Sequence, residues 1–186
     1  MAGARVILRH MKYLGLPLLA LLLIWWSGDA PARAPVQLTP ALAGMLSTLD
    51  PIGKRRLGRT KGKIVIVTFF ASWCPPCRWE FESLNALRER YGEDDLAIVA
   101  INRFETWAND AGGKRMKRFL AETKPAFPLV AGTEALAERF GGIERIPTLF
   151  VFDRKGRQAY AFVHLEGAEK MHAGTVELVA VIDALR

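Results

Sequence analysis

The sequence has few of the side chains that build metal centres. Its 186 residues contain only two cysteines and three histidines. A structural zinc site needs about four Cys or His ligands. One histidine, His10, lies in the amino-terminal segment, so only His164 and His172 remain to join the cysteines. We therefore expect no metal site and no bound cofactor.

Acidic residues are the scarcer charge, 19 against 26 basic residues, and the formal net charge is +7. Segment 54–63 contains no acidic residue. Such a basic run is typical of a solvated connector, of a nucleic-acid site or of a surface that contacts anionic lipid. No nucleic-acid-binding motif accompanies it. We therefore expect no nucleic-acid partner and interpret the segment as a connector, with membrane contact as the alternative. Its basic residues are Lys54, Arg55, Arg56, Arg59, Lys61 and Lys63.

No uncharged apolar run reaches the roughly 20 residues that a bilayer-spanning helix needs. The run from Tyr13 to Trp26 follows three basic residues and precedes the small-residue site Ala32-Arg33-Ala34. This order is typical of a signal peptide. Cleavage near Ala34 and retention as an amino-terminal membrane anchor both fit, and both place the rest of the chain outside the cytoplasmic membrane. We expect residues 1–34 to be the targeting segment and the protein to be periplasmic or otherwise extracytoplasmic.

We expect the remaining chain to form a linker with an amino-terminal extension, residues 35–60, followed by one folded domain, residues 61–186. No internal repeat of about 20–50 residues is present. Near-continuous β-branched and aromatic runs predict buried strands, and apolar residues at helical spacing predict amphipathic helices between them. The alternating order predicts an α/β sandwich with a central mixed sheet. The predicted strands are 63–72, 96–102, 126–130, 148–153 and 158–167, and the predicted helices are 38–49, 76–92, 114–123, 134–141 and 175–185.

Both cysteines fall in one short stretch, FFASWCPPCRWE, as Cys74 and Cys77. They lie where a buried strand passes into a helix, and one helical turn brings two sulfurs within bridging distance. Unpaired backbone N–H groups and the dipole at a helix N-terminus stabilise a thiolate. Cys74 is therefore the predicted nucleophile, with a lowered pKa, and Cys77 the resolving thiol. Pro75 and Pro76 suit this turn because neither needs to donate an N–H.

Other uses of a C-x-x-C pair fit less well. Attachment of c-type haem requires histidine at position 78, which is Arg78. A structural disulfide between residues so close in sequence stabilises little. A peroxidase relative requires a lone cysteine with Ser or Thr about four residues upstream, a context that Phe69–Ala71 lacks. A copper carrier, with both cysteines and one histidine as soft ligands, stays open as the alternative function.

The stretch around the cysteines resembles the TlpA/ResA-like thiol–disulfide oxidoreductases, which are membrane-anchored or periplasmic proteins of thioredoxin fold. The resemblance covers about residues 61–186. Besides the cysteine motif it rests on Lys61–Phe70, Phe127–Val130 and Arg145–Gly156. It implies a thioredoxin-like three-layer sandwich with a central mixed β-sheet and a subfamily insertion around residues 97–130.

The resemblance also implies roles for single residues around the disulfide of Cys74 and Cys77. Pro147 matches the cis-proline that faces the redox pair. Ile146 then presents its backbone to an extended substrate chain. Trp73 matches the tryptophan beside the cysteines, and with Pro75 and Pro76 it completes the expected substrate-binding surface.

Glu80 matches an acidic residue of the active-site helix that helps proton transfer to the cysteines. Its alternative is an ordinary surface residue beside Arg78. Thr68 stands where ordinary thioredoxins carry a buried aspartate, and a threonine cannot serve as a base. If a carboxylate assists Cys77, Glu80 is therefore the remaining nearby candidate.

The resemblance implies an enzyme that exchanges thiols and disulfides with cysteine pairs of protein substrates. Reduction is the expected direction, with electrons from an upstream membrane donor. The expected clients are apocytochrome c before haem attachment, or a copper-site protein of a respiratory complex. Trp79 and Phe81 are expected to pack rather than to bind substrate. Trp107 and Asn109, in a loop of the insertion, are candidates for the border of a partner groove.

Overall fold

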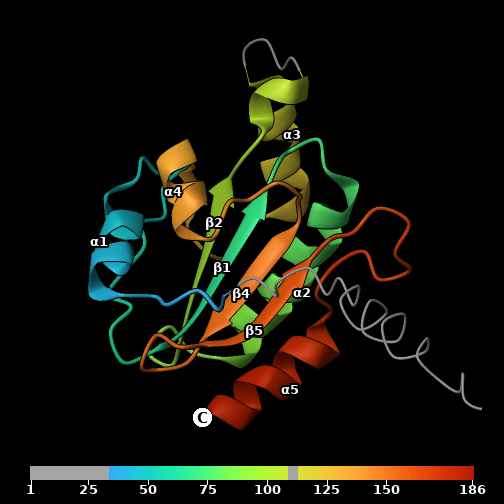
Figure 1. Cartoon of the computed structure of the whole chain (residues 1–186). Helices are drawn as coiled ribbons and strands as arrows, with labels where there is room; N and C mark the ends of the chain where they lie inside the picture. Colours follow the sequence, from blue (N-terminus) through green and yellow to red (C-terminus); the bar gives the residue numbers. More distant parts are fainter. Residues whose placement is uncertain (1–33, 109–112) are drawn as a thin grey trace, which may run out of the picture. The chain divides into compact units, whose positions relative to one another are not determined.

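The computed structural model describes residues 34–108 and 113–186 (Figure 1). The predicted targeting segment therefore lies outside the described residues, apart from Ala34. The described chain forms one compact unit, Ala34–Arg186. Within it, no helix is both long enough and apolar enough to cross a membrane.

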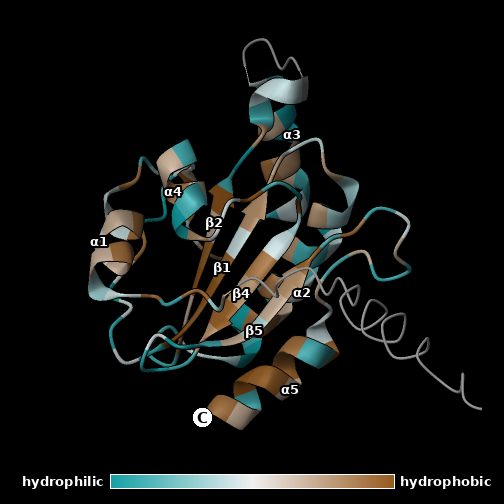
Figure 2. Ribbon diagram, in the orientation of Figure 1, coloured by the Kyte–Doolittle hydropathy of each residue, from teal (hydrophilic) through white to brown (hydrophobic). Residues whose placement is uncertain are grey.

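A five-stranded mixed sheet forms the centre of the unit, in the order β3-β2-β1-β4-β5. The central strand β1 pairs in parallel with β2 and antiparallel with β4, and β5 is antiparallel to β4. All seven residues of β1 are buried, as its near-continuous β-branched and aromatic run predicts. Figure 2 shows much of β1, β2 and β4 coloured as hydrophobic. The strands are β1 (Ile64–Phe70), β2 (Leu96–Asn102), β3 (Leu129–Ala131), β4 (Thr148–Phe152) and β5 (Gln158–Val163).

Helices cover both faces of the sheet, which gives the three-layer sandwich that the sequence predicts. Successive side chains of a strand point to opposite faces. Phe70 packs against Phe81 of α2 and Phe119 of α3, whereas Phe69 packs against Phe140 at the end of α4. Helix α5 lies against α2. The helices are α1 (Pro40–Thr48), α2 (Pro75–Arg90), α3 (Lys114–Thr123), α4 (Glu134–Arg139) and α5 (Thr175–Leu185), with a 3₁₀ turn η1 (Glu105–Ala108).

Part of the segment predicted as a linker belongs to the folded unit. Thr39 caps α1 by accepting a hydrogen bond from the backbone N–H of Leu42. Leu42 and Leu46 face the core, and Leu46 is 0% exposed. Apolar residues at this helical spacing bury one side of a helix. The compact unit thus begins at Ala34 rather than at residue 61.

Candidate active site

Cys74 and Cys77 are joined in a disulfide at the start of α2, as the spacing of the motif predicts. Cys74 is the N-cap residue, and its Sγ accepts a hydrogen bond from the backbone N–H of Cys77 at 3.3 Å. Pro75 and Pro76 occupy the first helical positions, where their missing N–H groups cost no intrahelical hydrogen bond. The backbone N–H of Cys77 and the positive end of the helix dipole therefore point at Cys74, where a thiolate forms on reduction.

The two cysteines are both buried, at 3% and 0% exposed, but they differ in their access to a groove. Cys74 lines a groove with a volume of about 430 Å³, whereas Cys77 is 0% exposed and does not line it. An incoming disulfide or thiol therefore meets Cys74 first. This supports the roles expected from the sequence, with Cys74 outside and Cys77 behind it. The groove is lined by Trp73, Cys74, Pro75, Pro76, Trp79, Phe104, Trp107, Glu144, Arg145, Ile146, His164 and Met171.

The turn before β4 forms one wall of this groove. Ile146 lines it, and the Ile146–Pro147 peptide bond is cis, as the resemblance implies. Pro147 is buried and does not line the groove itself. The carbonyl oxygen of Pro147 accepts a hydrogen bond from the backbone N–H of His164 at 3.0 Å.

Aromatic side chains form much of the rest of the groove. Trp73 donates its indole N–H to the carbonyl oxygen of Phe104 at 2.8 Å and stacks on Trp107. Trp107 is 69% exposed, which agrees with its predicted place at the border of a partner groove. Asn109 lies outside the described residues. Phe81 packs in the core as expected. Trp79 differs from expectation, because it is 45% exposed and lines the groove.

Glu80 is 0% exposed, so the surface alternative for this residue is wrong. Its Oε1 accepts a hydrogen bond from the hydroxyl of Thr68, and its Oε2 is buried with no hydrogen-bond partner among the described residues. Burial raises the pKa of Glu80 from 4.5 to about 7, although Thr68 and the nearby backbone N–H of Ala173 partly oppose this rise. A carboxyl that titrates near neutral pH suits proton transfer, and residues three apart share a helix face. Glu80 thus lies on the same face of α2 as Cys77.

The loop before Cys74 is held by a residue that the sequence does not single out. Glu105 of η1 accepts hydrogen bonds from the backbone N–H and the hydroxyl of Ser72. It also accepts one from the side-chain amide of Asn102 at 2.8 Å. Glu105 therefore ties the insertion to the active-site loop. Sequence spacing gives no signal for it, because Ser72 and Glu105 lie 33 residues apart.

The two described histidines lie near the groove without forming a metal centre. His164 lines it, and the ring of His172 packs 6.0 Å from that of Trp79. Burial lowers the pKa of His172. Among residues 34–108 and 113–186, no three His, Cys, Asp or Glu side chains come together as a set that could hold a metal ion. No observation thus favours the copper-carrier alternative.

The family model described as Redoxin matches residues 41–177. The chain belongs to this family. It is 26% identical over 156 residues to sporulation thiol-disulfide oxidoreductase A of Bacillus subtilis, a match that covers 84% of this chain and 91% of the relative. It is 29% identical over 97 residues to the thiol-disulfide oxidoreductase ResA of Bacillus thuringiensis, covering 52% of this chain and 53% of that one.

Solved structures show the same fold. A thiol:disulfide interchange protein of the thioredoxin family from Chlorobium tepidum superposes with a TM-score of 0.55 at 25% identity, over 75% of this chain and 96% of that one. StoA from Bacillus subtilis gives a TM-score of 0.55 at 21% identity, over 72% of this chain and 92% of that one. Together with the C-x-x-C disulfide, these relatives identify the chain as a thiol–disulfide oxidoreductase of thioredoxin fold.

Proposed function

We propose that this protein reduces disulfides in other proteins outside the cytoplasmic membrane. The observation that carries the proposal is the position of Cys74. It caps α2, where a thiolate is stabilised, and it is the cysteine of the pair that lines the aromatic groove. The charge and hydropathy pattern of residues 1–34 supports export, and disulfide exchange is typical of oxidising compartments.

The reaction is a pair of thiol–disulfide exchanges. The Cys74 thiolate attacks one sulfur of a client disulfide, forms a mixed disulfide and releases the client's other sulfur as a thiolate. The Cys77 thiolate then attacks Cys74 Sγ, which releases the second client thiol and leaves the Cys74–Cys77 disulfide. Two electrons have passed to the client. A membrane dithiol donor restores the reduced enzyme by the same steps in reverse.

Glu80 acts in this scheme as the proton acceptor for Cys77. Cys77 is buried, so its thiol cannot lose a proton directly to bulk water. A carboxyl with a pKa of about 7 on the same helix face accepts that proton at neutral pH and returns it when the disulfide is reduced again. Thr68 holds the carboxyl in place through its hydrogen bond.

The groove suits an extended client segment with apolar or aromatic side chains beside its cysteine. Exposed aromatic side chains bury large areas on binding, and Trp79 and Trp107 are among the most exposed large hydrophobic residues described. Candidate clients are apocytochrome c before haem attachment and copper-site proteins of respiratory complexes, both of which present paired cysteines.

The first test is the reduction potential of the Cys74–Cys77 pair, measured against glutathione buffers. A reductant is expected below about −200 mV, toward the thioredoxin end of the range. A value near about −120 mV, at the strong-oxidant end, would overturn the direction. The Cys77→Ser variant should then accumulate a mixed disulfide with the client, and the matched Cys74→Ser variant should not, because Cys77 does not line the groove.

A further inference from the structure

The basic segment 54–63 lies at the end of the sheet opposite the redox disulfide. It leads directly into the first residue of β1, whereas Cys74 follows the last residue of that strand. Helix α2 runs back the same way, from Cys74 at its N-cap to Arg88 in its last turn. A strand of seven residues and a helix of 16 residues each span about 20 Å. Both elements thus separate two ends of the domain, which we call the redox pole, at Cys74, and the basic pole, at segment 54–63.

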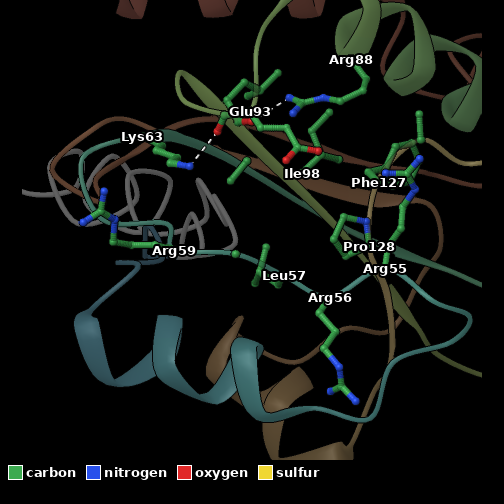
Figure 3. Close-up of a pocket in the computed structure, with 14 residues that line it drawn as sticks. Arg55, Arg56, Leu57, Arg59, Lys63, Arg88, Glu93, Ile98, Phe127 and Pro128 are labelled. Atoms are coloured by element: carbon green, nitrogen blue, oxygen red, sulfur yellow. Dashed lines mark hydrogen bonds between the residues drawn. The ribbon is translucent and has the colours of Figure 1, made fainter.

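A cavity of about 230 Å³ opens at the basic pole (Figure 3). Five basic side chains and one acidic side chain line it, together with apolar residues such as Leu57, Phe127 and Pro128. Lys63 donates to the carbonyl oxygen of Glu93 at 2.7 Å, and Arg88 donates to that of Leu96 at 2.7 Å. The lining residues are Arg55, Arg56, Leu57, Gly58, Arg59, Lys63, Arg88, Glu93, Leu96, Ala97, Ile98, Ala126, Phe127 and Pro128.

The positive charge around this cavity is only partly neutralised within the described chain, where Lys63 lies 4.0 Å from Asp94. Arg55, Arg56 and Arg59 are exposed and form no ion pair with any described residue. The Nε of Arg88 is buried without a hydrogen-bond partner among the described residues. Burial and the neighbouring charge of Arg55 lower the pKa of Arg88, and Glu93 opposes them. Like charges gathered along one cavity create a positive potential that favours an anion there.

The polypeptide also joins the domain at this pole. Gln37 forms a β-bridge with Arg157, and the backbone N–H of Leu38 donates to the carbonyl oxygen of Gly156 at 2.8 Å. This turn between β4 and β5 lies beside the start of β1, because Phe152 pairs with Val65. The described chain therefore enters the folded unit at the basic pole rather than at the redox pole.

We propose that the basic pole docks on a membrane surface by binding the phosphate headgroups of anionic phospholipids. The cavity matches that ligand, because its lining combines basic side chains for the phosphate with apolar residues for the adjoining glycerol. The position of the chain attachment favours a membrane over a soluble partner, since an anchored chain holds this pole next to the bilayer. Each Arg or Lys near an anionic bilayer raises the affinity about fivefold.

Docking in this way orients the enzyme. The disulfide then faces away from the bilayer at roughly the length of α2, about 24 Å, from the docked surface. Client proteins reach the aromatic groove without competing with lipid for its apolar lining. The inference concerns orientation and is independent of the direction of electron flow at the disulfide.

The test uses residues 34–186, which contain the whole described core, Val36 to Ile182, and so fold without the amino-terminal segment. Co-sedimentation is measured with vesicles of phosphatidylcholine alone and with 30% phosphatidylglycerol. The domain should bind only the anionic vesicles, and raised salt should weaken binding by screening. Arg55→Gln/Arg56→Gln should lose at least about tenfold in affinity.

The control is Lys117→Gln/Arg118→Gln, which removes the same charge from exposed positions on α3. Phe119 of this helix packs on Phe70 at the carboxyl end of β1, away from the basic pole. The control should bind within about twofold of the unchanged domain. Equal losses in both variants, or no binding to anionic vesicles, would overturn the proposal. Binding of inorganic phosphate without any vesicle binding would also overturn it, in favour of a soluble anion.

Discussion

The hydroxyl of Thr68 on β1 donates a hydrogen bond to the carboxyl group of Glu80 on α2, and both side chains are 0% exposed. Glu80 lies one helical turn after Cys77. The buried carboxyl is thus fixed between the central strand and the helix that carries the redox pair. Its protonation has consequences for both stability and rate.

The first prediction concerns stability against pH. Burial raises the pKa of Glu80 from 4.5 to about 7, so the folded chain holds this proton more tightly than the unfolded chain. The contribution of protonated Glu80 to the stability of the folded protein is therefore complete below about pH 4.5 and is lost as the pH rises through about 7. The loss amounts to roughly 3 kcal/mol. Urea unfolding of the disulfide form is measured at pH 4.5, 6 and 8. The free energy of unfolding of Glu80→Gln should rise relative to that of the unchanged protein as the pH increases.

The control for this experiment is Glu89→Gln, at an exposed position on the same helix. Its free energy of unfolding should follow that of the unchanged protein at every pH. Parallel curves for Glu80→Gln and the unchanged protein would show that Glu80 titrates normally.

The second prediction concerns the resolving step. The rate at which Cys77 releases a mixed disulfide should show an inflection near pH 7, where Glu80 changes protonation. Glu80→Gln should abolish the inflection and slow the step at pH 8 by about a hundredfold, the lower end of the range for a positioned base. Thr68→Val keeps the carboxyl but removes the hydrogen bond that lowers its pKa, so the inflection should move upward. Stopped-flow measurement of client release tests both, and an unchanged profile in Glu80→Gln contradicts the role.

Much of the fold follows from local patterns in the sequence. The run Ile64–Phe70, apolar except for Thr68, predicts a strand buried on both faces, and it becomes the centre of the sheet. The C-x-x-C spacing with two prolines predicts a helix N-terminus at Cys74, and the structure places it there. Each of these features depends on neighbours in sequence, which is why one sequence suffices to predict them.

The parts that sequence reasoning missed depend on long-range contacts. Thr68 and Glu80 meet only because β1 and α2 pack together, and Glu105 reaches Ser72 only because the insertion folds over the active-site loop. The role of segment 34–48 was also missed. The sequence predicts its helix, but only the structure shows that its buried apolar residues, Val36, Leu38, Leu42 and Leu46, complete the core.

The third prediction tests that extension. Leu46 is 0% exposed in α1, and Leu→Ala at a buried site removes apolar contacts and leaves a cavity. Leu46→Ala should lower the free energy of unfolding by about 2–5 kcal/mol. Ser47→Ala, at the next and exposed position, should change it by less than about 0.5 kcal/mol. Urea denaturation measures both, and equal stabilities would show that α1 is only loosely attached.

The fourth prediction concerns the loop before Cys74. Glu105→Ala leaves the amide and hydroxyl of Ser72 and the amide of Asn102 without their acceptor. Unsatisfied groups that are partly buried cost about 1–3 kcal/mol, so the unfolding free energy should fall by that amount. Alkylation of Cys74 in the reduced protein should change as the loop loosens. Glu105→Gln retains one acceptor oxygen and should recover part of both effects. Full stability in Glu105→Ala would show that the loop is held by other contacts.

The fifth prediction separates client binding from chemistry. Trp107 stacks on Trp73 and Phe104 at the groove, yet it is 69% exposed, so its removal costs little stability. Trp107→Ala should lower kcat/KM for a protein disulfide by about fivefold to tenfold, because a buried aromatic contact with the client is lost. Its reaction with dithiothreitol should stay unchanged, since that reagent is too small to contact Trp107 while reacting at Cys74. Val176→Ala, at an 86% exposed position on α5, is the matched control and should leave both rates unaltered. An equal decrease in the rates with the protein disulfide and with dithiothreitol would show that Trp107 positions Cys74 rather than binding the client.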